Sequence, residues 1–89
     1  MLSGDGPFAL KADLIETRLT DEVILLDPTT QQMYSLSGTG LLVWDALRSE
    51  TIADAAVRLT EHFEVPLDVA TNDVRAFADR LLDAGLLRR

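Results

Sequence analysis

The side chains that most often carry chemistry in proteins are scarce in this chain of 89 residues. It holds one histidine, His62, and no cysteine. A cysteine–histidine nucleophile, a histidine-based metal cluster and a thiolate metal site therefore cannot be built from this chain alone. Because His62 has no candidate partner, we interpret it as a surface or boundary residue rather than a catalytic one.

Two other patterns could point to a ligand, and both are weak. Gly38 and Gly40 enclose a single residue, a spacing too short for a dinucleotide-binding fingerprint, and no βαβ unit surrounds them. The pair is better explained as the entrance of a helix. The 15 acidic residues are dispersed and show no EF-hand spacing. The sequence thus predicts no catalytic residue, no metal site and no cofactor, and it argues against an enzyme.

Length, composition and charge narrow the class of protein. Hydrophobic residues make up 47% of the chain and the net charge is −7, as in a soluble globular protein, and the length predicts one domain over residues 1–89. No segment reaches the roughly 20 apolar residues of a membrane span, and the N-terminus lacks the features of a signal peptide. We therefore expect a cytoplasmic protein whose residues 1–13 form a loosely ordered N-terminal segment.

The first half of the chain shows the patterns of short strands separated by turns. Turn residues include Asp21 in the first connection, and Asp27 followed by Pro28 in the second. The strands are predicted at residues 14–20, 23–26 and 33–36. In the last of these, Met33 and Tyr34 are adjacent and must point to opposite faces. Three strands joined in this way form an antiparallel meander.

From residue 37 onward the apolar residues recur at helical spacing. Ser37 or Thr39 can cap the first helix, and Thr51 caps the second with Asp54 as a short variant of the capping box. The third helix spans roughly residues 67–84, and Gly85 follows at the position where a left-handed residue ends a helix.

Each helix carries an apolar stripe that predicts its buried face. The stripes comprise Leu41, Leu42, Trp44, Ala46 and Leu47; Ile52, Ala55, Ala56, Leu59 and Phe63; and Val69, Val74, Phe77, Ala78, Leu81 and Leu82. After the third helix, Leu86 and Leu87 can fold back onto the core. The order βββααα predicts a compact α+β domain of winged-helix-like architecture, with a three-stranded antiparallel β-meander followed by three α-helices.

These elements also resemble the PqqD family, over about residues 14–87. The resemblance rests on an ordered series: the LLD strand and turn, a short strand ending in Leu, and GTG leading to an apolar helix with Trp. The series continues with the RLTEHFEVP helix end and then DVRAF followed by LLDAGLL. Family members often have Asn at the position of Ser37, but serine also caps helices well.

The resemblance implies a precursor-peptide recognition element of ribosomal peptide natural product pathways. In this family the leader segment of the precursor pairs with the third strand as a fourth strand, in a groove beside the third helix. An unguarded strand edge offers unused N–H and C=O groups, and the third strand has none of the usual guards such as Lys, Pro or a charge. The strand residues expected to bind peptide are Gln32, Met33, Tyr34, Ser35 and Leu36.

Backbone pairing reads little sequence, so pockets for side chains must supply specificity. Asp73, Ala76, Phe77 and Arg80 share one side of the third helix within two turns and are the expected groove residues. Phe77 also has the spacing of a core residue. Whether Asp73 and Arg80 form a polar rim of the groove or an ordinary solvated face is left open.

The resemblance further implies partners. A free-standing chain of this kind resembles the separate recognition subunits of lasso-peptide systems. There the partners are a leader peptidase of cysteine-protease type and an ATP-dependent cyclase resembling asparagine synthetase. The chain would then deliver the leader to these enzymes without catalysis of its own.

Two alternatives compete with this hypothesis. The first is a winged-helix DNA-binding regulator, but phosphate neutralisation needs clustered Lys and Arg. The third helix instead holds Asp68, Asp73, Asp79 and Asp83 against Arg75 and Arg80. Such a surface repels phosphate. The second, a structural subunit that docks on an enzyme complex through the same strand edge, stays open.

Overall fold

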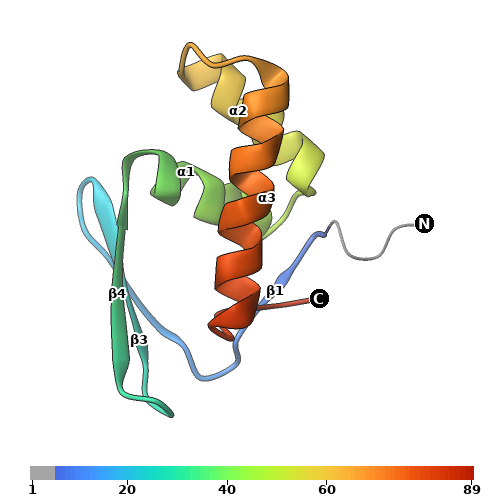
Figure 1. The fold of residues 1–89 in the computed structure, drawn as a ribbon. Coiled ribbons are helices and arrows are strands. Elements are labelled where there is room, and N and C mark those ends of the chain that lie inside the picture. Colours follow the sequence, from blue (N-terminus) through green and yellow to red (C-terminus); the bar gives the residue numbers. More distant parts are fainter. Residues whose placement is uncertain (1–5) are drawn as a thin grey trace.

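The structure is a computed structural model, and it describes residues 6–89. Within these residues, five strands and three helices follow one another (Figure 1). In order they are β1 (Ala9–Leu10), β2 (Ile15–Arg18), β3 (Glu22–Asp27), β4 (Gln32–Ser37), α1 (Gly38–Leu47), α2 (Ile52–His62), α3 (Leu67–Asp83) and β5 (Leu87–Arg88). The predicted α+β fold, a three-stranded meander followed by three helices, is confirmed.

Strands β2, β3 and β4 form one antiparallel sheet in that order. Ile15 of β2 lies opposite Leu26 of β3, which in turn lies opposite Met33 of β4. Val23 and Leu25 are completely buried on the helix side of β3, whereas their neighbours in the strand are only partly covered. This alternation shows that the helices pack on one face of the sheet.

The turn between β3 and β4 is organised by a buried carboxylate. Asp27 is 1% exposed, and its Oδ1 accepts a hydrogen bond from the backbone N–H of Thr29 at 3.0 Å. The ammonium group of Lys11 lies 2.5 Å from the same oxygen. The hydrogen bond from Lys11 and the turn amides hold the pKa of Asp27 below its ordinary value, although burial opposes this shift. Gln31 closes the turn with a positive φ of 61°.

The capping signals predicted for α2 and α3 are confirmed, whereas at α1 the N-cap residue Ser37 makes no side-chain capping hydrogen bond. At α2, the Thr51 side chain accepts from the Asp54 N–H and the Asp54 carboxylate accepts from the Thr51 N–H, which confirms the capping box. At the end of α3, Gly85 has φ 78°, and its N–H donates to the carbonyl of Leu82. The N–H of Leu86 donates to the carbonyl of Leu81, so the helix ends in a Schellman motif.

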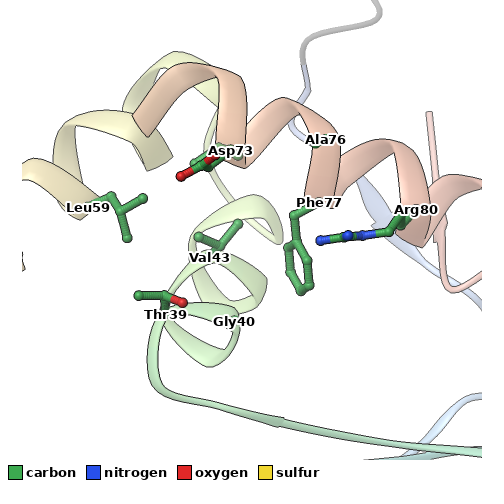
Figure 2. Close-up of a pocket in the computed structure, with 9 residues that line it drawn as sticks. Thr39, Gly40, Val43, Leu59, Asp73, Ala76, Phe77 and Arg80 are labelled. Carbon is green, nitrogen blue, oxygen red and sulfur yellow. The ribbon is translucent and has the colours of Figure 1, made fainter. Parts of the chain in front are cut away.

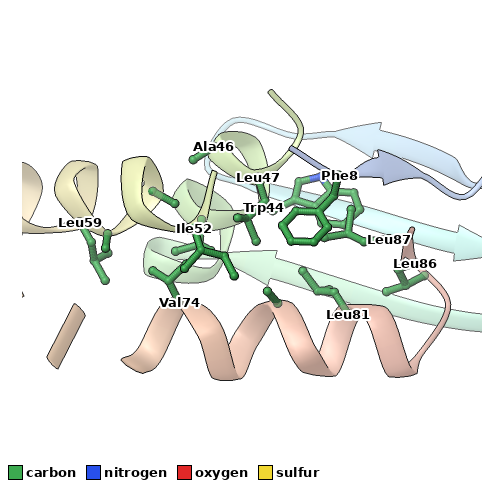
Figure 3. Close-up of a cluster of buried hydrophobic side chains, with 14 of the residues drawn as sticks. Phe8, Trp44, Ala46, Leu47, Ile52, Leu59, Val74, Leu81, Leu86 and Leu87 are labelled. Carbon is green, nitrogen blue, oxygen red and sulfur yellow. The ribbon is translucent and has the colours of Figure 1, made fainter. Parts of the chain in front are cut away.

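The core lies between the sheet and the three helices, with Trp44 of α1 fully buried in it (Figure 3). The predicted core position of Trp44 is therefore confirmed. Leu86 and Leu87 are 1% and 2% exposed and fold back onto the same cluster, as predicted. They follow Gly85, whose left-handed conformation turns the chain back toward the helices.

The N-terminal segment is more ordered than the sequence indicated. Residues 1–5 of the predicted loose segment lie outside the described residues. In the remainder, β1 pairs with β5 and Phe8 is only 4% exposed. The backbone N–H of Phe8 donates to the carbonyl of Leu47 at 3.2 Å. An aromatic side chain that reaches the core thus fixes this segment beside the C-terminus.

Two residues assigned to apolar stripes are on the surface. Phe63 and Val69 are each 42% exposed. α2 ends at His62, so Phe63 has extended backbone angles and leaves the helical stripe. On α3 the buried face is defined by Ala70, Val74, Ala78 and Leu81, and Val69 precedes the first of these by one residue, about 100° around the helix.

Candidate functional site

Strand β4 is an edge of the sheet, and its register shows which backbone groups are free. The N–H of Leu19 donates to the carbonyl of Glu22, so Glu22 directs its backbone groups to β2. Because the direction alternates along an antiparallel strand, Val23, Leu25 and Asp27 direct theirs to β4. Their partners there are Leu36, Tyr34 and Gln32. The backbone groups of Met33 and Ser35 therefore face the open edge, as does the N–H of Ser37, whereas the carbonyl of Ser37 accepts the first hydrogen bond of α1 because Ser37 is the N-cap residue.

The side chains of β4 alternate in the same way. Tyr34 and Leu36 are half-buried and pack against the core, whereas Met33 is 67% exposed on the opposite face. The prediction that Met33 and Tyr34 point to opposite faces is confirmed. Ser35 is also on the outer face, where its hydroxyl donates to the Glu22 carboxylate at 2.9 Å.

A pocket of about 350 Å³ opens between α1 and α3 (Figure 2). All four predicted groove residues of α3 line it, namely Asp73, Ala76, Phe77 and Arg80. The other lining residues are Thr39, Gly40, Val43, Leu59 and Val74. Sequence reasoning missed Thr39, Val43 and Leu59, which come from α1 and α2. The spacing of the GTG motif indicates a helix entrance but does not indicate that this entrance faces α3.

The pocket joins the end of β4 at Gly40. A Cβ atom at Gly40 would lie 3.8 Å from Phe77 Cζ and 4.0 Å from Leu36 Cδ2. Leu36 of β4 and Phe77 of α3 therefore both lie beside the first turn of α1. None of the predicted peptide-binding residues of β4 lines the pocket. Leu36, however, lies beside Gly40, which does line it. An extended segment paired with β4 would pass this point.

The wall of the pocket combines apolar and charged groups. The Arg80 guanidinium lies 5.8 Å from the centre of the Phe77 ring, a cation–π distance. Figure 2 shows the Arg80 side chain extending toward the ring, with Asp73 farther along the same helix. Phe77 is half-buried and packs on the core, so it is both a core residue and a pocket residue. This arrangement suits binding of a ligand that places an apolar side chain in the pocket and polar groups at its rim.

Within residues 6–89, no three His, Asp or Glu side chains are grouped to hold a metal ion. His62 is exposed, and its Nδ1 is 3.0 Å from the backbone carbonyl of Arg58. No helix in this part of the chain combines the length and apolar character that crossing a bilayer requires.

The family model described as coenzyme PQQ synthesis protein D (PqqD) matches residues 22–87. The chain belongs to the PqqD family. Its match begins at the first residue of β3 and ends inside β5, so it includes the open edge of β4 and all the pocket residues. A comparison with curated proteins gave no match.

Two solved structures resemble this PqqD-family chain. One is a lasso peptide synthetase B1 complexed with the leader peptide, with 25% sequence identity and a TM-score of 0.86 over 94% of this chain and 100% of that one. The other is TbiB1 in complex with the TbiA(beta) leader peptide, with 21% identity and a TM-score of 0.82 over 89% and 93% of the two chains. At 21% identity, the second likeness shows the fold alone.

Proposed function

We propose that this chain binds the leader segment of a ribosomally synthesised precursor peptide and catalyses no reaction itself. The leader adds to β4 as a fourth strand and runs beside α3. The observation that carries the proposal is the open edge of β4, whose end meets the α1–α3 pocket at Gly40. A similar structure, that of a lasso peptide synthetase B1, is complexed with a leader peptide, which supports this use of the fold.

In this proposal the backbone and the pocket have separate tasks. The outward N–H and C=O groups of Met33 and Ser35 pair with the peptide backbone, which gives affinity for any extended segment. The pocket takes an apolar side chain against Ala76 and Phe77, while Asp73 and Arg80 bind polar groups at its rim. Specificity for one leader then comes from the pocket.

The proposal includes the partners that act on the captured peptide. They are a leader peptidase and an ATP-dependent cyclase, to which the chain delivers the precursor. In this proposal, peptide cleavage and ring closure are carried out by these partners.

A direct titration tests the proposal. Fluorescein-labelled leader peptide is titrated with the purified protein and followed by anisotropy, and the mass of the peptide is measured afterwards. We expect micromolar or tighter binding, about −8 kcal/mol or better, with an unchanged peptide mass. A scrambled peptide of the same composition is the control for specificity. A processed peptide in the absence of partner enzymes would contradict the non-catalytic role.

A parallel titration with duplex DNA tests the winged-helix alternative. α3 exposes Asp68, Asp73, Asp79 and Asp83, so it presents an acidic surface where a recognition helix needs basic side chains. We expect no binding of DNA at low salt. DNA binding stronger than leader binding would favour the regulator instead.

A further inference from the structure

The face of the sheet opposite the helices is apolar and uncovered. Its side chains form three cross-strand rows: Ile15, Leu26 and Met33; Thr17, Ile24 and Ser35; and Leu19, Glu22 and Ser37. We call its five apolar members the outer sheet face: Ile15, Leu19, Ile24, Leu26 and Met33. Three of them are 48–67% exposed, and the other two are partly exposed.

The packing of residues 6–89 shows why their helices leave this face uncovered. The buried residues of β3 are Val23, Leu25 and Asp27, all on the helix side. Arg18 of β2 also points to that side, where it binds the carboxylate of Asp45 on α1 at 2.8 Å. No helix of residues 6–89 therefore covers the opposite face.

The charges around the outer sheet face have one sign. Glu22 is the only charged residue in the three rows, and Ser35 donates to its carboxylate. The turn beside Leu19 adds Asp21, and Asp13 precedes β2 by two residues, and both are exposed. A second copy of the chain would bring a like-charged rim against this one, and the net charge of −7 makes that pairing unfavourable.

We propose that the outer sheet face docks a partner protein with an apolar centre and Lys or Arg side chains at its rim. Strands are about 4.8 Å apart and alternate residues along a strand about 6.8 Å apart, so the three rows span about 10 by 14 Å. That is the size of the central cluster of an interface rather than of a whole one, which takes about 800 Å² per partner. The acidic residues beside the cluster supply part of the surrounding contact.

The outer sheet face lies next to the strand edge that would bind the leader, so the role of a partner docked there rests on the proposed function. Met33 belongs both to the outer sheet face and to β4, whose free edge would pair with the leader. A partner seated on this face reaches the bound peptide without displacing it from the α1–α3 pocket, which lies on the helix side. The partner is accordingly one of the enzymes that process the captured precursor.

The test measures binding of the purified leader peptidase and of the cyclase from the same biosynthetic system to immobilised protein. Ile15 is 50% exposed and lies on β2, the strand farthest from the proposed peptide edge. We expect Ile15→Lys to weaken binding of at least one enzyme tenfold or more, and Ile15→Glu to weaken it less because the partner rim is basic. Val69→Lys, at an exposed apolar residue of α3, is the matched control and should bind as the parent does.

Three further measurements keep the outcomes separate. Leader titration should be unchanged in both Ile15 variants, so that a failure of peptide binding in the parent would count against the proposed function and not against this surface. Melting temperatures report folding, and if Ile15→Lys unfolds, Ile15→Thr removes apolar area while keeping a β-branched strand residue. Asp21→Lys should weaken binding of the same enzyme, and this effect should be greatest at low salt.

The proposal is overturned if both enzymes bind folded Ile15 variants as tightly as the parent, or if neither enzyme binds the parent. It is also overturned if sedimentation shows that the parent forms a dimer that Ile15→Lys dissociates, since the face would then be an interface between copies of this chain. Tenfold loss with unchanged leader binding and an unaffected Val69→Lys variant supports it.

Discussion

Arg80 extends over the ring of Phe77, with its guanidinium carbon 5.8 Å from the ring centre. The two residues are three apart on α3, so they lie on one side of the helix and both line the α1–α3 pocket. The contact orients the charged group along the pocket wall instead of leaving it free in solvent. Arg80 is thus already placed to meet a polar group of a bound peptide.

The first prediction concerns this pair. Arg80→Gln should weaken leader binding by about 1 kcal/mol, about fivefold in Kd, because exposed cation contacts are modest in strength. Arg80→Lys retains the charge but loses the planar guanidinium group, so we expect it to weaken leader binding less than Arg80→Gln does. Both are measured by peptide titration at two salt concentrations. Equal binding by the parent and Arg80→Gln would remove Arg80 from the site.

The second prediction concerns the volume of the pocket. Ala76→Trp places a large ring in a pocket of about 350 Å³ and should reduce leader binding at least tenfold. Stability should change little, because Ala76 is exposed. The control is Ala53→Trp, at an exposed alanine of α2 that does not line this pocket. If Ala76→Trp binds like the parent, the leader lies elsewhere.

The third prediction uses the alternation along β4. The N–H of Ser35 faces the open edge, so Ser35→Pro should leave the fold intact and reduce leader binding at least tenfold. The N–H of Tyr34 faces β3, so Tyr34→Pro should instead lower the melting temperature of the protein. Circular dichroism and peptide titration of the two neighbouring variants separate these effects. Full binding by folded Ser35→Pro would exclude strand addition at this edge.

The fourth prediction concerns Asp27 and pH. The folded pKa of Asp27 is lowered by its hydrogen bond from Lys11, so its stabilising effect is present above the unfolded carboxyl pKa of about 3.9. The effect is lost as the pH falls through the lower folded pKa. Asp27→Asn should therefore reduce the melting temperature most at neutral pH, and the difference from the parent should narrow in acid.

Lys11 provides the control for this prediction. Lys11→Met removes the partner at 2.5 Å, and a second substitution, Asp27→Asn, should then cost less than it does in the parent. Melting temperatures of the four proteins between pH 2.5 and 7 give the comparison. A gap between Asp27→Asn and the parent that stays constant down to pH 2.5 would show that the ionised pair is not responsible.

The sequence alone was sufficient to predict the three-stranded meander and the three helices of this protein, but not the short strands β1 and β5. Thr51 with Asp54 and Gly85 mark helix ends through hydrogen bonds and backbone angles within a few residues. Alternation in the strands and the position of Trp44 on its helix likewise depend on short-range periodicity. Helical spacing also places Asp73 and Arg80, two turns apart, on one side of α3, whereas a groove beside this helix was implied only by the family resemblance.

Only the tertiary structure determined which residues of different elements contact one another. Thr39 and Leu59 enter the pocket because α1 and α2 pack beside α3, a contact between segments that no local pattern encodes. Phe8 is buried because β1 pairs with β5 at the far end of the chain, and Lys11 reaches Asp27 across sixteen positions. Periodicity reports which side of an element is apolar, but packing angles and long-range pairing determine which residues from different elements come together.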